Sequence, residues 1–188
     1  MILEIPEGEF EGYIFDCDGT LVDSMPLHYR AWTASFRHHD APWDWSEDEF
    51  YASAGIPDRQ IVGNLNRQYE AEIDPDSVHE YKLAWYMERM SELTPVEAVA
   101  EQVRKCLAMN APISVATGSD LSLVKPSLKF VGLWELFDII VTPADVERGK
   151  PAPDMFLLAA EKMKIAPEKC LVFEDGQAGI DAATAAGM

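Results

Sequence analysis

Short apolar runs alternate with helical segments through the second half of the chain, and this alternation restricts the possible folds more than any other feature. The runs are Ile113-Ser114-Val115-Ala116-Thr117, Ile139-Ile140-Val141 and Cys170-Leu171-Val172-Phe173. The segments with helical spacing are Val96–Met109, Leu121–Phe130, Asp154–Lys164 and Ala178–Ala186. Parallel strands buried on both faces read as continuous apolar runs, and helices connect them. The pattern predicts an α/β fold with a Rossmann-like, three-layer parallel sheet.

Two places depart from this regular pattern. Pro126 lies inside a predicted helix, where a proline removes a hydrogen bond and clashes with the preceding turn, so we expect the helix to kink or begin there. The sequence ends at Gly187-Met188, where a sheet of this kind would usually continue into another strand.

A purely helical stretch separates the first predicted strand, around Tyr13-Ile14-Phe15, from the alternating pattern. Ser24 is a candidate N-cap for its first helix. Turn-like clusters and no strand-like run separate the segments Leu27–His39, Glu47–Ala54, Asp58–Tyr69 and Asp76–Glu92. We predict a core domain of residues 1–24 and 94–188, with residues 25–93 inserted as a helical cap. The core of this cap is expected to contain Trp32, Trp43, Trp45 and Trp85.

The composition limits partners and compartment. A net charge of −18 argues against nucleic acid or an anionic membrane as the main partner. No apolar run has the length of a membrane span, and the N-terminus is too acidic for a signal peptide. Cys17, Cys106 and Cys170 are odd in number and lack a metal-binding spacing, which favours reduced, packed thiols. We expect a cytoplasmic protein and favour a monomer.

Asp16 and Asp18 follow the first predicted strand. Residues i and i+2 of a strand share a face, so both carboxylates should enter one pocket while Cys17 packs away from it. Their repulsion is relieved if a divalent cation lies between them, or if one acid stays protonated. The alternative is an ordinary strand that ends in an Asp-Gly turn.

Polar residues also follow the later predicted strands, and ligands of open α/β sheets bind at the carboxyl ends of strands. Thr117 can donate a hydrogen bond, the amide of Gly118 can approach an anion, and Lys150 supplies a cation. Glu174 and Asp175 can complete an oxygen shell for Mg²⁺.

Four motifs together resemble the haloacid dehalogenase superfamily of phosphotransferases. They are Asp16-x-Asp18-Gly19-Thr20, Thr117-Gly118-Ser119, Lys150-Pro151-x-Pro153-Asp154 and Glu174-Asp175. The helical insertion is similar to that of members with an α-helical cap, of the β-phosphoglucomutase and sugar-phosphate phosphatase type. The Gly55-Ile56-Pro57 turn adds a likeness to bacterial phosphatases that act on fructose 1-phosphate and related sugar phosphates.

The resemblance implies a Mg²⁺-dependent phosphatase for a small phosphorylated metabolite, acting through an aspartyl phosphate. Asp16 would be the nucleophile and Asp18 the general acid and base. Mg²⁺ would be held by Asp16, the main-chain carbonyl of Asp18, and Asp175, with Glu174 nearby. The phosphoryl oxygens would contact Thr117, Gly118, Ser119 and Lys150.

The resemblance also suggests substrate contacts in the cap, with hinges near residues 19–24 and 92–95. His28 lies where such caps place a substrate-facing histidine. Arg59 and Lys82 are the cap cations that we expect to contact the sugar or a second anion. Each of these side chains could instead be an ordinary solvated group on a helix.

Two other functions remain to be weighed. A β-phosphoglucomutase-type mutase uses the same two aspartates, and Thr20 favours the phosphatase only slightly. A catalytically silent binding protein would be expected to lack the nucleophile or the lysine, and Asp16 and Lys150 are both present. No Gly-x-Gly-x-x-Gly follows the first strand, which excludes a nucleotide-binding dehydrogenase.

Overall fold

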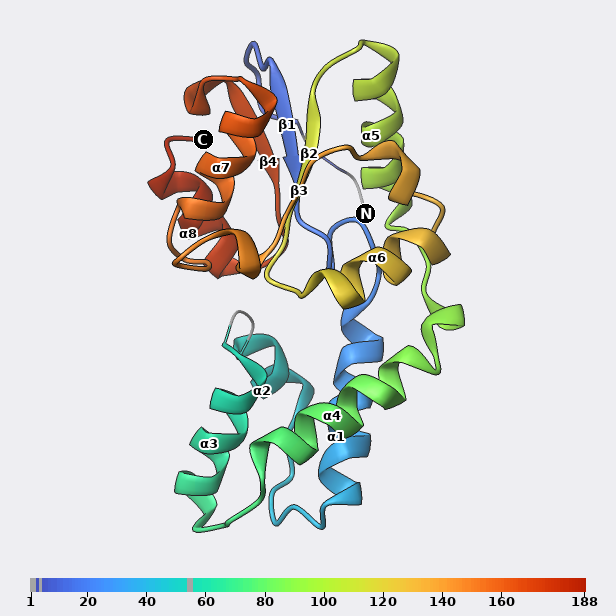
Figure 1. Ribbon diagram of the computed structural model, residues 1–188, viewed down its shortest axis with the longest axis vertical. Helices are drawn as coiled ribbons and strands as arrows, with labels where there is room; N and C mark the ends of the chain where they lie inside the picture. The colour runs from blue at the N-terminus through green and yellow to red at the C-terminus, as the bar shows by residue number, and fades with distance from the viewer. Residues whose placement is uncertain (1–2, 4, 54–55) are drawn as a thin grey trace. The chain divides into compact units, whose positions relative to one another are not determined.

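The computed structural model describes residues 3, 5–53 and 56–188 (Figure 1). Gly55 of the predicted cap turn, and Ala54 at the end of one predicted helix, lie outside these residues. The chain forms two compact units. The core unit comprises Met1–Ser24 and Leu93–Met188, and the helical unit comprises Met25–Glu92.

A parallel sheet forms the centre of the core unit, as predicted. Its strands are β1 (Gly12–Phe15), β2 (Ile113–Ala116), β3 (Ile140–Val141) and β4 (Cys170–Phe173), in the spatial order β3-β2-β1-β4. Phe15 at the end of β1 is paired with Val115 on one side and with Phe173 on the other. The residues that follow β1 therefore leave the sheet between the ends of β2 and β4.

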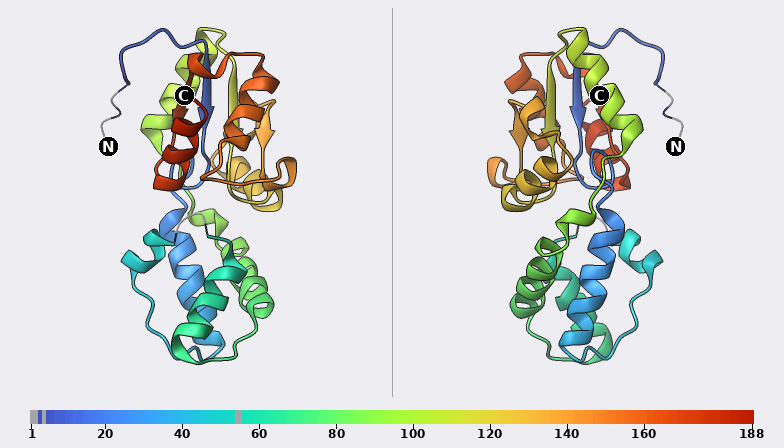
Figure 2. Two further views of the ribbon diagram at one scale, coloured as in Figure 1. Left: turned by 90° about the vertical axis from the view of Figure 1, so that its left-hand side faces the viewer. Right: turned by 90° about the vertical axis from the view of Figure 1, so that its right-hand side faces the viewer.

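Helices cover both faces of this sheet, which confirms the three-layer prediction (Figures 1 and 2). They are α5 (Glu97–Ala108), α6 (Leu121–Phe130), α7 (Asp154–Met163) and α8 (Gln177–Ala185). Figure 1 shows α7 and α8 on one side of the sheet and α5 on the other. Ile14, Ala116 and Val141 pack in one buried cluster with Met155 and Phe156 of α7. Short 3₁₀ helices cover Met90–Glu92, Trp134–Leu136, Pro143–Asp145 and Pro167–Lys169.

Helix α6 runs through Pro126, so of the two predicted alternatives a helix start at this residue is wrong, and a kink stays a prediction. The missing N–H of Pro126 removes one helical bond, that to the carbonyl of Ser122. Ser122 is exposed, so solvent can hydrate this carbonyl. Val124 and Leu128 of the same helix are buried, and their packing offsets the lost bond.

The α-helices in the described residues of the helical unit are α1 (Met25–His38), α2 (Glu47–Ala52), α3 (Asp58–Tyr69) and α4 (Pro75–Met87). Trp32, Trp43 and Trp45 are buried in one cluster, as predicted. Trp85 is only partly buried, and its ring lies 3.9 Å from the Arg89 guanidinium and 5.5 Å from that of Arg30. Trp85 therefore carries cation–π contacts and is not part of that cluster.

Two further predictions concern cysteines and membrane spans. Cys17, Cys106 and Cys170 are buried and form no disulfide, in agreement with packed thiols. In the described part of the chain, no helix combines the length and the apolar character that a membrane span requires.

Candidate active site

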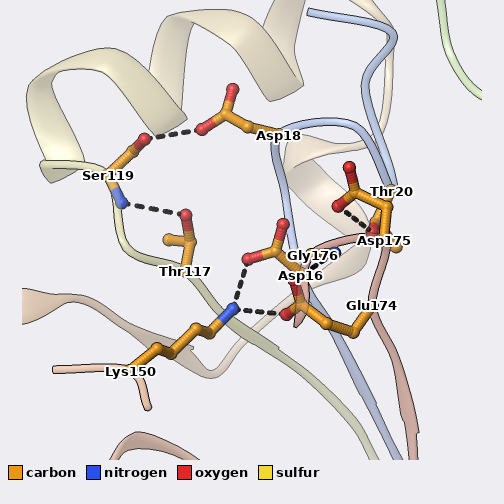
Figure 3. A network of polar contacts seen from close by, with 9 residues as sticks. All are labelled: Asp16, Asp18, Thr20, Thr117, Ser119, Lys150, Glu174, Asp175 and Gly176. Carbon is orange, nitrogen blue, oxygen red and sulfur yellow. Dashed lines mark hydrogen bonds and ion pairs between the residues drawn. The ribbon is translucent and has the colours of Figure 1, made fainter. Parts of the chain in front are cut away.

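Lys150 joins two carboxylates that follow different strands (Figure 3). Its Nζ lies 2.6 Å from Asp16 Oδ1 and 2.6 Å from Glu174 Oε2, and all three side chains are less than one-tenth exposed. Asp16 follows β1 and Glu174 follows β4, whose ends are neighbours in the sheet. The main-chain N–H of Asp16 donates to the carbonyl of Phe173 at 2.9 Å, which continues the sheet pairing up to the site.

Asp16, Glu174 and Asp175 form an acid cluster, in which each offers an oxygen within 4.8 Å of the others. When ionised, three carboxylates and the Lys150 ammonium leave two negative charges in a small volume. Carboxylate oxygens and this excess charge fit Mg²⁺, which prefers hard oxygen ligands. The Asp18 carboxylate is not part of the cluster among the described residues, and the role of its main-chain carbonyl stays a prediction.

Burial opposes ionisation of Asp16 and Asp175. It raises the pKa of Asp16 to about 8, against the opposing charge of Lys150 and with a further increase from Glu174. Burial also raises the pKa of Asp175, and the charge of Glu174 adds to that effect. Burial would lower the pKa of Lys150, but Asp16 and Glu174 raise it above its ordinary value, so the amine stays an ammonium. A cation would favour ionisation of both aspartates.

The Gly19-Thr20 turn positions Asp175. Thr20 Oγ1 donates to Asp175 Oδ1 at 3.1 Å. Gly19 has a φ of +85°, which disfavours residues with a side chain, and a Cβ there would lie 2.1 Å from Asp175 Oδ2. Gly19 and Thr20, which belong to the first motif, therefore also position Asp175, the last residue of the fourth motif.

Asp18 is placed by a turn and not by strand alternation, so that part of the prediction is wrong. Strand β1 ends at Phe15, and the amides of Leu21 and Val22 both donate to the carbonyl of Cys17, at 3.0 and 2.9 Å. The side chain of Cys17 is fully buried, as expected. The turn closes because several donors converge on one carbonyl, a feature that a residue pattern does not show.

Two serine hydroxyls hold the Asp18 carboxylate. Ser24 Oγ donates to Oδ1 at 2.7 Å, and Ser119 Oγ donates to Oδ2 at 2.6 Å. Ser24 was expected as a helix N-cap and Ser119 as a substrate contact. The structure brings both hydroxyls to Asp18, and contact of Ser119 with substrate stays a prediction. The Asp18 carboxylate is therefore fixed from both sides.

The loop after β2 carries the remaining predicted site residues. Thr117 is buried, and its Oγ1 accepts from the amide of Ser119 at 3.1 Å, so the hydroxyl proton is available for donation to a ligand. Gly118 is exposed, and a Cβ placed on it would have no neighbour within 4 Å. The open space at Gly118 and the Thr117 hydroxyl suit an anion, and contact of the Gly118 amide and of Thr117 with substrate stays a prediction.

The predicted cap residues all lie in the helical unit. His28 is buried and stacks on Tyr86, with ring centroids 4.2 Å apart. Lys82 is buried, with Nζ 2.7 Å from Asp58 Oδ2 and 4.5 Å from the centre of the Trp32 ring. Arg59 is exposed and forms an ion pair with Asp76. Contact of these side chains with a substrate stays a prediction.

An ionic network around Asp58 was not predicted. His79 Nδ1 lies 3.0 Å from the carboxylate oxygen that also accepts from Lys82. Burial would raise the pKa of Asp58, but the bonds from His79 and Lys82 outweigh it and lower the pKa to about 2. His79 and Lys82 are three residues apart on α4 and share a helix face, a spacing that could have revealed the pair.

The two connections to the helical unit are hydrogen-bonded to each other inside the core unit. The amide of Asp23 donates to the carbonyl of Thr94 at 2.9 Å, and the amide of Val96 donates to that of Leu21 at 3.1 Å. Val22 and Pro95 form an antiparallel bridge between the same segments. The predicted hinges thus lie beside a short paired segment.

Comparison with known proteins agrees with this geometry. Residues 10–187 match the profile of a family of haloacid dehalogenase-like hydrolases. The fructose-1-phosphate phosphatase YqaB of Escherichia coli is 35% identical, over 95% of this chain and 94% of that protein. A β-phosphoglucomutase of Bacillus subtilis is 29% identical, over 93% of this chain and 79% of its own. The crystal structure of CbbY from Rhodobacter sphaeroides in complex with phosphate superposes with a TM-score of 0.83 and 25% identity, covering 95% and 84% of the two chains.

Proposed function

Because this chain belongs to the family of haloacid dehalogenase-like hydrolases, we propose that it is a Mg²⁺-dependent phosphatase that hydrolyses a small sugar phosphate through an aspartyl phosphate on Asp16. The observation that carries the proposal is the contact of Lys150 with both Asp16 and Glu174, each at 2.6 Å, beside Asp175. It supports one site with a buried carboxylate nucleophile, a buried cation and metal ligands.

Charge compensation explains why the site combines these groups. A carboxylate about 4 Å from one unit charge of a phosphate dianion is opposed by roughly 4 kcal/mol at an effective dielectric of about 20. The Lys150 ammonium offsets this repulsion next to Asp16 and stabilises charge on the phosphoryl oxygens. Mg²⁺ held by Asp16, Glu174 and Asp175 would supply further positive charge.

Asp16 and Asp18 divide the reaction between them. Asp16 attacks phosphorus, and the bond from phosphorus to the sugar oxygen breaks while Asp18 gives that oxygen a proton. Asp18 then takes a proton from water, whose oxygen forms the new bond to phosphorus and releases Asp16. Ser24 and Ser119 hold the Asp18 carboxylate for both proton transfers.

The phosphoryl group would be bound by Thr117, Gly118 and Lys150, at the ends of β2 and in the loop after β3. Thr117 would offer a hydroxyl proton, and Gly118 would offer its main-chain amide beside the open space at that residue. The sugar would be recognised by His28, Arg59 and Lys82 of the helical unit. A sugar phosphate as substrate is supported by the similarity to the fructose-1-phosphate phosphatase of E. coli, which extends over nearly the whole chain.

A mutase is the second candidate, supported by the similarity to the B. subtilis β-phosphoglucomutase. The two functions differ in whether water or a second sugar hydroxyl accepts the phosphoryl group from Asp16. Phosphate release from fructose 1-phosphate with Mg²⁺, and no formation of glucose 6-phosphate from β-glucose 1-phosphate and a bisphosphate activator, supports the phosphatase. The reverse result supports the mutase. The absence of phosphate release from any sugar phosphate, together with no formation of glucose 6-phosphate, contradicts both.

A panel of sugar phosphates, phosphoglycolate and nucleotides, each assayed with Mg²⁺ and with EDTA, identifies the substrate class. We expect the highest kcat/KM for a small sugar phosphate and loss of turnover in EDTA. Full activity in EDTA would contradict the metal dependence, and preference for a nucleotide would contradict the substrate assignment.

A further inference from the structure

Helix α8 approaches Glu174 at a glycine, Gly179, which is the third residue of the helix and is buried. A Cβ on Gly179 would lie 2.0 Å from Glu174 Cδ, 2.2 Å from Oε2 and 2.4 Å from Cγ. Real Cβ atoms do not approach other heavy atoms this closely. The Glu174 side chain therefore occupies the space that a side chain at position 179 would need.

The Glu174 carboxylate also contacts Lys150 and Gly176, so its position beside Gly179 affects the rest of the site. Its Oε2 accepts from Lys150 Nζ at 2.6 Å, and its Oε1 accepts from the main-chain N–H of Gly176 at 3.2 Å (Figure 3). The carboxylate thus lies between the lysine on one side and the first turn of α8 on the other. A shift away from α8 would change its distance to Lys150 and to the other acids of the cluster.

The three atoms nearest to the virtual Cβ all belong to Glu174. Glu174 is therefore the side chain that a residue larger than glycine at position 179 would meet first. Glycine is also less favourable than alanine inside a helix. Its presence in the first turn of α8 is explained by the position of Glu174 and not by the helix itself.

We propose that Gly179 is a positioning residue, which seats the Glu174 carboxylate against Lys150 and thereby sets the geometry of the acid cluster. The consequence for Mg²⁺ rests on the proposed function, whereas the steric coupling of Gly179 with Glu174 does not. Glu174 is a flexible side chain, so an alanine at position 179 is expected to displace its carboxylate while the chain still folds.

A double-mutant cycle in metal-free buffer tests the steric coupling. It compares the thermal unfolding midpoints of the natural protein, Gly179→Ala, Glu174→Ala and the double variant. In the Glu174→Ala background the clash is gone, and Gly179→Ala should raise the midpoint by about 2–4 °C through helix propensity alone. In the natural background, where Glu174 is present, Gly179→Ala should not raise the unfolding midpoint. The same shift in both backgrounds would overturn the proposal.

Titration calorimetry with MgCl₂ alone tests the consequence for the site. We expect Gly179→Ala to weaken Mg²⁺ binding roughly tenfold or more, as for other residues that orient metal ligands. Gly63→Ala is the matched control, because the nearest atom to its Cβ, Arg67 Nη1, is 3.8 Å away. Unchanged affinity in Gly179→Ala would overturn its role at the site. A natural protein that binds no Mg²⁺ would contradict the proposed metal dependence, and the cycle would still decide the coupling.

Discussion

Ser119 Oγ donates a 2.6 Å hydrogen bond to the Asp18 carboxylate, although the two residues are 101 positions apart in the chain. This bond joins the loop after β2 to the turn after β1. It also means that a residue of the second motif acts on the proposed general acid and base.

Ser119→Ala should lower kcat about tenfold and leave KM nearly unchanged, because Asp18 loses one of its two hydroxyl partners and is less well oriented. Steady-state kinetics with fructose 1-phosphate, measured as a function of pH, checks this expectation. Ser122→Ala, at an exposed position of α6, is the control. A change in KM alone would show that Ser119 contacts substrate instead.

Asp16→Asn should reduce turnover at least about a thousandfold, because an amide oxygen is a poor nucleophile for phosphorus. The fold should persist, since Lys150 retains its contact with Glu174. Phosphate release and circular dichroism of the same preparation measure the two effects. Hydrolysis at the natural rate would refute Asp16 as the nucleophile.

Asp58 should make the helical unit less stable as the pH falls below about 4. Its pKa falls from 3.8 to about 2 on folding, so the stabilisation is fully present above pH 3.8 and is lost as pH falls towards 2. This difference corresponds to about 2 kcal/mol. Asp58→Asn should therefore lower the free energy of unfolding by about that amount at pH 6 and by much less at pH 2.

Denaturant unfolding followed by tryptophan fluorescence suits this measurement, because Trp32, Trp43, Trp45 and Trp85 report mainly on the helical unit. Asp76→Asn is the control, since the Asp76 side chain is 63% exposed and exposed ion pairs contribute little. Equal losses for the two variants at pH 6 would argue against the Asp58 network.

Ser114→Ala should stabilise the protein by about 1 kcal/mol, because the hydroxyl is buried in β2 without a hydrogen-bond partner among the described residues. Ser35→Ala is the contrasting variant, because it removes a buried hydroxyl that does have a hydrogen-bond partner. The hydroxyl of Ser35 is buried and donates to the carbonyl of Val78 at 2.8 Å, so its removal should destabilise. Free energies of unfolding of both variants test the pair, and destabilisation by Ser114→Ala would contradict it.

The sequence was sufficient for the sheet and the main site because one geometric rule connects them. Parallel strands end at the same edge of a sheet, so the residues that directly follow the strands were expected to gather there. The structure adds that β1 and β4 are neighbours. Asp16 and Glu174 lie together at this edge, and Lys150 reaches both of them from the loop after β3.

The features that were missed depend on contacts between distant segments. No local pattern indicates that Ser24 and Ser119 bind Asp18, or that Gly179 makes room for Glu174. Strand alternation could not place Asp18, because the turn after Phe15 is closed by main-chain bonds to Cys17. Pro126 was misjudged because burial of Val124 and Leu128 overrides a local preference.

The pairing of Asp23 with Thr94 has a consequence for how the gene can be rearranged. The segment that leaves the core unit and the segment that returns are hydrogen-bonded neighbours, so residues 25–92 are attached as a single long loop. An insertion whose two ends already lie together can be exchanged, lengthened or removed without stretching the sheet. The helical unit is in this sense a replaceable module, attached to the core unit at one paired segment.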